Sequence, residues 1–426
     1  MEKSNKKYKT YLQILDRELV PAMGCTEPIA LAFCAAKARA VLGVLPDTVD
    51  IIVSGNIIKN VKSVIVPHTG GMKGMESAAA IGILAGRAER GLEVLSDVTE
   101  SEQAKLGDYL KSTAFHVSVA ESDEVLDIMV RVSRGKDNAA VRIVRQHTNI
   151  VKIEKNGITL FEKSAISEFE DGKQDYTLLS IKDIYDFALS VDIDDVKAIL
   201  DRQIQYNTAV SKEGLKKDYG ANIGTVLLKS YGGDVRNRAK AKAAAGSDAR
   251  MNGSELPVII NSGSGNQGMA TSLPIIEYAR ELNSASEQLY RALVISNLTA
   301  IHQKTGIGAL SAYCGAVSAG AAAGAGIAFL HGGDYNAISH TIINALAITS
   351  GIVCDGAKAS CAAKIAAAVD AGILGYDMYQ NGQQFYSGDG IVSEGVENTI
   401  RNIGLLGKDG MRETDKEILC IMTCFD

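Results

Sequence analysis

The chain lacks tryptophan altogether, and aromatic residues make up only 5% of its 426 residues. It contains 42 glycines, and long stretches consist mainly of alanine, glycine and serine. This composition favours tightly packed helices with close backbone approach over a β-sandwich. The apolar content of 46% and the charged content of 22% are ordinary for a soluble globular protein. The length allows two or three domain-sized units, each with its own core.

An excess of positive charge is also missing, because the formal net charge is −6. This argues against a nucleic-acid binder and against a protein with a polybasic membrane surface. The N-terminus is charged and amphipathic, with neither the apolar core nor the cleavage site of a signal peptide. We therefore expect a cytoplasmic protein, whose seven cysteines stay reduced and act as ligands or catalysts rather than as disulfides.

Residues 307–330 form a run of 24 residues without a charge, which is long enough to span a bilayer. The run consists mostly of glycine, alanine and serine, and it has neither a Leu/Ile/Phe-rich centre nor basic flanks. A buried helix of a soluble protein explains it better than a membrane span. A membrane permease is therefore the least favoured class of function.

Hydrophobic periodicity predicts an α+β protein, in which N-terminal helices and a small antiparallel sheet are followed by a large, mainly helical region. A polar, acidic connector at 163–177 divides the chain into an N-terminal region, 1–163, and a helical region, 178–426. In the first region we expect helices at 8–20, 29–42, 75–91 and 99–112, two short strands within 47–67 around a turn at Gly55-Asn56, and antiparallel strands over 116–161.

Three cysteines, Cys314, Cys354 and Cys361, lie in or beside the small-residue stretch. No C-x-x-C pair exists, so zinc ribbons, ferredoxin-type runs and thioredoxin chemistry lack their usual spacing. Three thiols from one region suggest a metal or iron–sulfur site with one ligand position left open. Inert core thiols explain the spacing equally well.

Cys25 has a different setting, just before a helix for which Thr26 is the expected N-cap. The positive end of a helix macrodipole favours a thiolate, and small flanking residues would leave the sulfur accessible. Such a thiolate could be a base, a nucleophile or a ligand, and a buried cysteine beside a turn is an equally good explanation. Cys34 is expected in the core, whereas Cys420 and Cys424 form an i, i+4 pair without an assigned role.

The loop NSGSGNQG, residues 261–268, precedes a helix expected to begin near Met269. It offers backbone N–H groups and polar side chains to an anion, but it has the pattern neither of a Walker A loop nor of a dinucleotide-binding loop. A small carboxylate is the better guest, and a flexible turn with a helix cap is the alternative. His68 and His331 stand in two further glycine loops, although a lone histidine at a turn is more often structural.

Four motifs occur together: GCTEP at 24–28, HTGG at 68–71, NSGSGNQG at 261–268, and Cys314 with CDGAKASC at 354–361. With this combination the chain resembles, over nearly its whole length, the L-cysteine desulfidase (UPF0597-like) family, which is related to the α chain of iron–sulfur L-serine dehydratases. The resemblance implies a [4Fe–4S] cluster held by Cys314, Cys354 and Cys361, with Cys25 as the base. By likeness and chemistry together, the expected substrate-binding residues are Thr69, Gly70, Asn261, Ser262, Gly263, Ser264 and Asn266.

The function that the resemblance implies is α,β-elimination of L-cysteine to sulfide, ammonia and pyruvate. The cluster would act as a Lewis acid, and pyridoxal phosphate would not be required. The alternatives are an iron–sulfur-dependent L-serine dehydratase, in which hydroxide leaves in place of sulfide, and a non-enzymatic iron–sulfur redox sensor. The expected partner is a small amino-acid substrate, with no nucleic acid and no membrane. The sequence is compatible with a homo-oligomer, but no feature of it indicates one.

Overall fold

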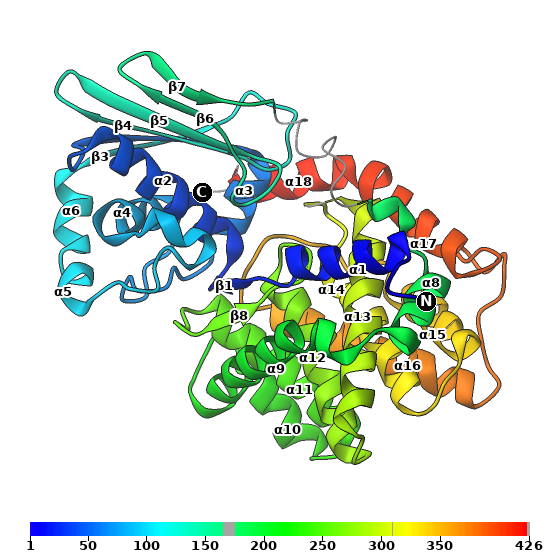
Figure 1. Ribbon diagram of the computed structural model, residues 1–426. Helices are drawn as coiled ribbons and strands as arrows, with labels where there is room; N and C mark the ends of the chain where they lie inside the picture. The colour runs from blue at the N-terminus through cyan, green and yellow to red at the C-terminus, as the bar shows by residue number, and fades with distance from the viewer. Residues whose placement is uncertain (165–174, 309, 424–426) are drawn as a thin grey trace.

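A six-stranded sheet forms one side of the molecule (Figure 1). Its strand order is β3–β2–β4–β5–β6–β7, and all neighbours are antiparallel except β2 and β3. The computed structural model describes residues 1–164, 175–308 and 310–423. The strands are β2 (Thr48–Val53), β3 (Ala114–Val119), β4 (Asp127–Arg134), β5 (Asp137–Val144), β6 (Ile150–Lys155) and β7 (Ile158–Glu162). The predicted antiparallel sheet is thus confirmed, with one parallel edge strand that an alternating pattern does not reveal.

Helices cover one face of this sheet (Figure 1). Helix α2 (Thr26–Leu42) packs against β4 and β5, and α4 (Met75–Ala85) packs against α2. Cys34 of α2 is fully buried, and its thiol donates to the Val141 carbonyl at 3.2 Å, which confirms it as a core residue. The remaining helices of this part are α3 (Gly55–Val61), η1 (Ala88–Glu93), α5 (Glu100–Gln103) and α6 (Leu106–Ser112).

The second strand predicted within 47–67 is wrong, because this segment forms helix α3. Ile57, Ile58 and Val61 are spaced one and three residues apart, and all three are buried. A short apolar run of this kind fits either a strand or one helical turn, so the pattern alone could not decide. The single helix expected at 99–112 is likewise divided into α5 and α6.

The rest of the described chain is mainly helical, as predicted, and its central helices are rich in alanine and glycine. The helix expected to start near Met269 begins earlier, at Gly265. The elements are η2 (Tyr176–Leu178), α8 (Ile181–Ser190), α9 (Ile193–Lys216), α10 (Ile223–Tyr231), α11 (Val235–Met251), α12 (Gly265–Glu281), α13 (Ser286–Ile307), α14 (Gly315–Leu330), α15 (Tyr335–Thr349), α16 (Cys361–Gln380), α17 (Val396–Leu405), η3 (Leu406–Gly410) and α18 (Arg412–Thr423).

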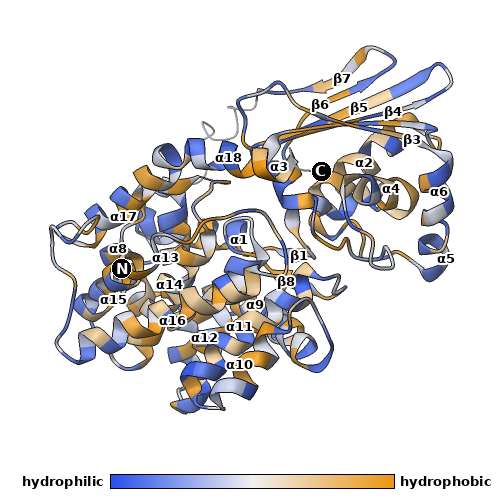
Figure 2. Cartoon of the chain, turned by 180° about the vertical axis from the view of Figure 1, so that it is seen from behind, coloured by the Kyte–Doolittle hydropathy of each residue, from blue (hydrophilic) through white to orange (hydrophobic). Residues whose placement is uncertain are grey.

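Several segments join the two parts of the chain. Strand β1 (Pro21–Met23) pairs antiparallel with β8 (Pro257–Ile259), and Figure 2 shows this pair between the sheet and the helices. Helix α1 (Lys6–Glu18) packs on α9 and α13 of the helical part, whereas α18 returns to contact α3. The boundary predicted at 163–177 stays a prediction, and most of it, 165–174, lies outside the described residues.

The uncharged run at 307–330 is not one helix. Helix α13 ends at Ile307, and the buried helix α14 begins only at Gly315. Helix α14 contacts α12, α13, α15 and α16, which explains its lack of charge. Within the described ranges, no helix has both the length and the apolar character needed to cross a bilayer.

Helices α14 and α16 cross so closely that their glycines are required. A Cβ on Gly372 would lie 2.1 Å from the Gly320 carbonyl oxygen. We therefore expect Gly372→Ala to lower the free energy of unfolding by about 1–3 kcal/mol, as overpacked cores do. Urea denaturation in reducing buffer measures this. Gly107→Ala is the matched control, because no atom lies within 4 Å of its Cβ position in α6. Equal effects of the two substitutions would contradict the packing argument.

Candidate active site

The N-termini of four long helices meet where the two parts of the chain join. Cys25 is the N-cap of α2, Cys314 is the N-cap of α14, and Cys361 is the first residue of α16. Cys25 belongs to a small buried cluster with Val64, Met251 and Ala357, and Cys361 packs against this cluster. The fourth helix, α12, reaches the same place, because its Gln267 side chain lies against the start of α14. Four partial positive charges at helix ends therefore point into one region.

A tight turn places Cys25 in this region. Gly24 has a φ of 56°, and a Cβ there would lie 2.6 Å from Pro67, so glycine is required on both counts. The Cys25 thiol donates to Oε2 of Glu27 at 3.1 Å. Cys25 itself, not Thr26 as predicted, is the N-cap of the helix.

The expected accessible thiolate at Cys25 is not found. Its side chain is only 2% exposed, and burial raises the pKa of the thiol well above its usual range, with Glu27 raising it further. Arg250 acts in the opposite direction but is outweighed. Of the two explanations that the sequence left open, the buried cysteine beside a turn is the one that the structure shows, because burial and a carboxylate in the first turn outweigh the helix dipole.

Glu27 is a buried carboxylate held by partners from distant segments. Burial alone would raise its pKa, but the His147 contact, the Cys25 hydrogen bond and the Arg250 charge together lower the pKa to about 2. His147 Nε2 lies 3.6 Å from Glu27 Oε1. Of Glu27 and its three partners, only Cys25 was predicted as a site residue. Glu27 could have been found from the sequence, because it is an acidic residue in the first turn of the helix that follows Cys25. Nothing in the sequence around His147 or Arg250 points to the site.

Cys314 and Cys354 lie on two short segments that pair with each other. The Cys314 amide donates to the Ile352 carbonyl at 3.2 Å, and the Cys354 amide donates to the Ala312 carbonyl at 2.6 Å. The two thiols share a hydrogen bond, which lowers the pKa of Cys354 to about 6, while the pKa of Cys314 is raised. Cys361 is close enough to interact electrostatically with both.

Lysine side chains surround these three cysteines. Lys59, 1% exposed, donates to the Cys354 carbonyl at 3.3 Å, and its charge helps to lower the pKa of the Cys354 thiol. Lys304 is also buried, which lowers the pKa of its amine, although the Cys354 and Cys314 sulfurs oppose this. Lys364 pairs with Asp355 in the loop before α16. The surroundings therefore favour a thiolate at Cys354, whereas the hydrogen bond with Cys354 and burial raise the pKa of the Cys314 thiol, and burial raises the pKa of the Cys361 thiol.

The 261–268 loop reaches the site with only some of its residues. Asn261 is fully buried and turns inward, where its amide donates to Asn297, and Ser262 donates to Asn261 at 2.9 Å. Ser264 is the N-cap of α12. Two positions face the residues around Cys25: a Cβ on Gly263 would lie 3.1 Å from His147, and the Asn266 amide donates to the sulfur of Met251 at 3.7 Å.

The HTGG loop lies beside the Cys25 turn, because its neighbour Pro67 packs on Gly24. The Thr69 hydroxyl is used within the loop, where it donates to the Val66 carbonyl at 2.7 Å and accepts from the Met72 amide. Gly70 is exposed and has a φ of 70°. Their roles in substrate binding stay predictions.

The histidines of the two glycine loops have different surroundings. His68 Nδ1 lies 3.2 Å from Glu255 Oε1, at the edge of the site region. His331 follows the C-terminus of α14, at the opposite end of that helix from Cys314, and stacks on Tyr376. Cys420 is exposed on α18, and its predicted i, i+4 partner Cys424 lies outside the described residues.

Comparison with known proteins gives the family. A model of the serine dehydratase alpha chain matches residues 89–420. The chain belongs to the serine dehydratase alpha chain family. The matched segment contains the three cysteines, the 261–268 loop, His147 and Arg250, and it begins beyond Cys25 and Glu27.

Relatives extend over the whole chain. A UPF0597 protein from Desulfitobacterium hafniense is 60% identical over 99% of this chain and 98% of its own length. UPF0597 proteins from Lachnoclostridium phytofermentans and Treponema denticola are 54% and 49% identical, over 97% and 99% of this chain and 99% of their own lengths. The predicted relation to UPF0597 proteins and to the serine dehydratase alpha chain is confirmed.

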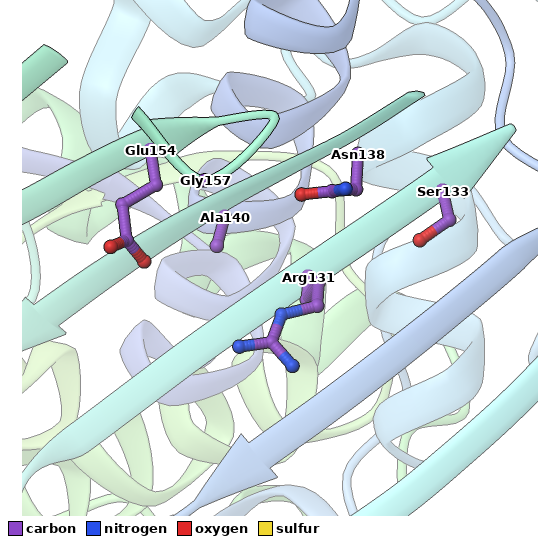
Figure 3. A pocket seen from close by; sticks show the side chains of 6 residues that line it. All are labelled: Arg131, Ser133, Asn138, Ala140, Glu154 and Gly157. Atoms are coloured by element: carbon purple, nitrogen blue, oxygen red, sulfur yellow. The ribbon is translucent and has the colours of Figure 1, made fainter. Parts of the chain in front are cut away.

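In this serine dehydratase alpha chain family member, a hollow also opens on the sheet, on the face shown in Figure 3. Its volume is about 340 Å³, and it is lined by Arg131, Ser133, Asn138, Ala140, Glu154 and Gly157. None of these residues belongs to the predicted site. The hollow is polar, and it is formed by β4, β5, β6 and the turn before β7.

An ion pair connects the C-terminal helix α18 to Lys59, which also donates to the Cys354 carbonyl. Lys59 pairs with Asp415 of α18, so Asp415→Asn would leave a buried ammonium without its partner. We expect this substitution to lower the free energy of unfolding by about 3 kcal/mol, and a second substitution, Lys59→Met, to restore much of the loss. Urea denaturation of the single and double variants measures both effects. Glu413→Gln, at an exposed pair on the same helix, is the control and should leave stability unchanged. An Asp415→Asn protein as stable as wild type would contradict this account.

Proposed function

We propose that this protein is an L-cysteine desulfidase, which converts L-cysteine to sulfide, ammonia and pyruvate by α,β-elimination. The observation that carries the proposal is the position of Cys25. Cys361 packs against the buried cluster that contains Cys25, and it belongs to the three-cysteine group, Cys314, Cys354 and Cys361. A candidate base and a candidate metal site are therefore adjacent, although Cys25 and Cys361 are 336 positions apart in the sequence. Membership of a family named for a lyase supports the same class of reaction.

Cys314, Cys354 and Cys361 would hold a [4Fe–4S] cluster. Among the described residues there is no group of three or more His, Cys, Asp or Glu side chains arranged around a single metal ion. A four-iron cluster is larger than one ion and its ligands stand further apart, while three thiols, one with a pKa of about 6, among buried lysines are a suitable donor set. When bound, the cluster would supply a Lewis acid at the iron without a cysteine ligand.

The residues of the chain would then move one proton. Burial and Glu27 favour the neutral thiol at Cys25, so the scheme requires this thiol first to lose its proton to water. The thiolate then takes the proton from Cα of the substrate, the C–H electron pair becomes the Cα–Cβ double bond, and the Cβ–S bond breaks with its electron pair on sulfur. The released aminoacrylate tautomerises and is hydrolysed by water to pyruvate and ammonia. Glu27 orients Cys25 through the 3.1 Å hydrogen bond, and Arg250 favours the thiolate form. Pyridoxal phosphate has no part in this scheme, and the reduced thiols suit the cytoplasm.

A second candidate is L-serine dehydratase, and the description of the matching family favours it specifically. The same residues would bind the substrate and remove the α-proton, but hydroxide would leave from Cβ in place of sulfide. The two reactions differ in the atom that the metal must accept as leaving group. The test is therefore a comparison of substrates on one preparation.

The experiment is anaerobic purification and cluster reconstitution, followed by assays with L-cysteine and L-serine in parallel. Equimolar sulfide and pyruvate from L-cysteine, lost after oxidation of the cluster, is the expected result. Pyruvate from L-serine alone would move the function to the dehydratase. A stable cluster with neither activity would favour a redox sensor, and a protein that takes up no cluster would contradict the metal site.

A further inference from the structure

Arg250 is a buried cation that makes no direct ion pair in the described part of the chain, although its charge lowers the pKa of Glu27. It is the second-last residue of α11, and it is only 3% exposed. Its Nε has no hydrogen-bond partner, and no carboxylate lies within ion-pair distance of the guanidinium in the described ranges. Burying an unpaired charge is costly, so natural proteins pair such groups or place them where a ligand binds.

A helix N-terminus stands directly against this guanidinium. Gly265 is the first residue of α12, a helix of 17 residues, and a Cβ there would lie 2.3 Å from Arg250 Nε. The backbone amides of Gly265 and Asn266 make no hydrogen bond to any described residue. A guanidinium and the positive end of a helix are therefore placed together without an anion between them, which is the arrangement of an anion-binding site.

Two buried carboxylates, Glu27 and Asp248, have other partners. Glu27 accepts from the Cys25 thiol at 3.1 Å and lies 3.6 Å from His147 Nε2. Asp248 is two residues before Arg250 on the same helix, so it points to another side, where it accepts from the Gly224 amide of α10. Glu27 is near enough for the Arg250 charge to lower its pKa, but it makes no ion pair with Arg250, so the guanidinium is available to a ligand carboxylate.

We propose that Arg250, together with the first-turn amides of α12, binds the carboxylate of an α-amino-acid substrate. The inference rests on the proposed function, because it assigns a residue to the substrate of that same site. The carboxylate is bonded to Cα, so a carboxylate held at Arg250 brings the α-proton toward Cys25. The closeness of the two residues is also visible in the effect of the Arg250 charge, which lowers the pKa of the Cys25 thiol.

Unused acceptors beside Arg250 fit the other charged group of an amino acid. The side-chain oxygens of Asn266 and Gln267 are buried and have no donor among the described residues. Gln267 also lies against Gly315, next to Cys314, and so extends from the anion site toward the cysteines. An α-ammonium group could donate to these oxygens, so the site favours an α-amino acid over a simple carboxylic acid.

The test is binding, measured by calorimetry on the anaerobic, cluster-loaded protein. The probe is L-alanine, which has no leaving group at Cβ and is not consumed, and L-alaninamide is the matched ligand without a carboxylate. We expect wild type to bind L-alaninamide roughly 100-fold more weakly than L-alanine, and Arg250→Gln to weaken L-alanine binding by roughly the same factor. Arg250→Lys, which keeps the charge but loses the planar fork, should weaken it about tenfold.

Arg238→Gln on the same helix is the control variant. Arg238 pairs with Glu281 at the far end of α11, so its replacement should leave L-alanine binding as in wild type. Circular dichroism establishes that each variant is folded. Equal affinity of wild type for the two ligands, which needs no variant, would overturn the inference, and so would unchanged L-alanine binding by folded Arg250→Lys and Arg250→Gln.

Failure of this inference is distinguishable from failure of the proposed function. Arg250-dependent binding of L-alanine, without turnover of L-cysteine or L-serine, would uphold the carboxylate site and contradict the lyase. Turnover of L-cysteine, with affinities that do not depend on Arg250, would uphold the lyase and overturn the carboxylate site.

Discussion

Cys25→Ser is expected to abolish turnover of L-cysteine while the iron content of the protein stays that of wild type. A serine hydroxyl at the N-cap of α2 can still donate to Glu27, so the turn is kept, but it cannot be deprotonated at neutral pH to serve as a base. Removal of a positioned base costs about 10²- to 10⁴-fold in rate. The measurement is pyruvate formation per cluster, with iron and acid-labile sulfide determined on the same samples.

Cys34→Ser is the matched control for this prediction, because Cys34 lies on the same helix but in the core. Its thiol donates to the backbone carbonyls of Ile128 and Val141 in the sheet, and a serine can donate to the same Val141 oxygen. The control should keep the turnover per cluster of wild type. If Cys25→Ser loses iron together with activity, Cys25 is a metal ligand, and if it keeps activity, it is not the base.

The second large effect is expected at Cys354, whose replacement by serine should remove the cluster. Cys354 has a pKa of about 6, because it shares a proton with Cys314 and lies near Lys59, so it is a thiolate near neutral pH. A serine hydroxyl stays protonated under the same conditions and is a poor ligand for iron. We expect the visible absorbance of the reconstituted protein and its turnover to fall together, to less than about a tenth of the wild-type values.

Cys420→Ser is the control here, because Cys420 is exposed on α18 and outside the three-cysteine group. It should reconstitute as wild type does. A Cys354→Ser protein that binds iron and sulfide in wild-type amounts would contradict the assignment of Cys354 as a ligand, whatever its activity.

Much of the fold could be predicted from the sequence, because long elements carry strong local signals. The sheet strands alternate with period two, and the alanine-rich helices are bounded by glycines and by N-caps such as Asp234 and Ser264. Segment 55–61 shows where such signals fail, because a short apolar run fits a strand or a helix and its packing against α2 and α18 is not visible in the sequence.

Only those site residues that belong to a recognisable motif could be predicted from the sequence. The cysteines at helix N-termini stand out as chemically distinctive residues, but the state of Cys25 depends on burial and on Glu27, which a helix-end argument does not include. His147 follows a sheet strand and Arg250 is the second-last residue of a helix, and neither belongs to a recognisable motif. They join Cys25 because β1 pairs with β8 and brings distant segments together, which is a long-range contact that periodicity does not encode.

The most direct test of elimination at Cα is the fate of the α-hydrogen. We would incubate the reconstituted protein with L-cysteine carrying deuterium at Cα and follow the products by nuclear magnetic resonance. The account predicts that every sulfide released is matched by one pyruvate and by one deuterium lost to water. Sulfur release with alanine that keeps its deuterium would contradict it, because the C–S bond would then be cleaved without removal of the α-proton.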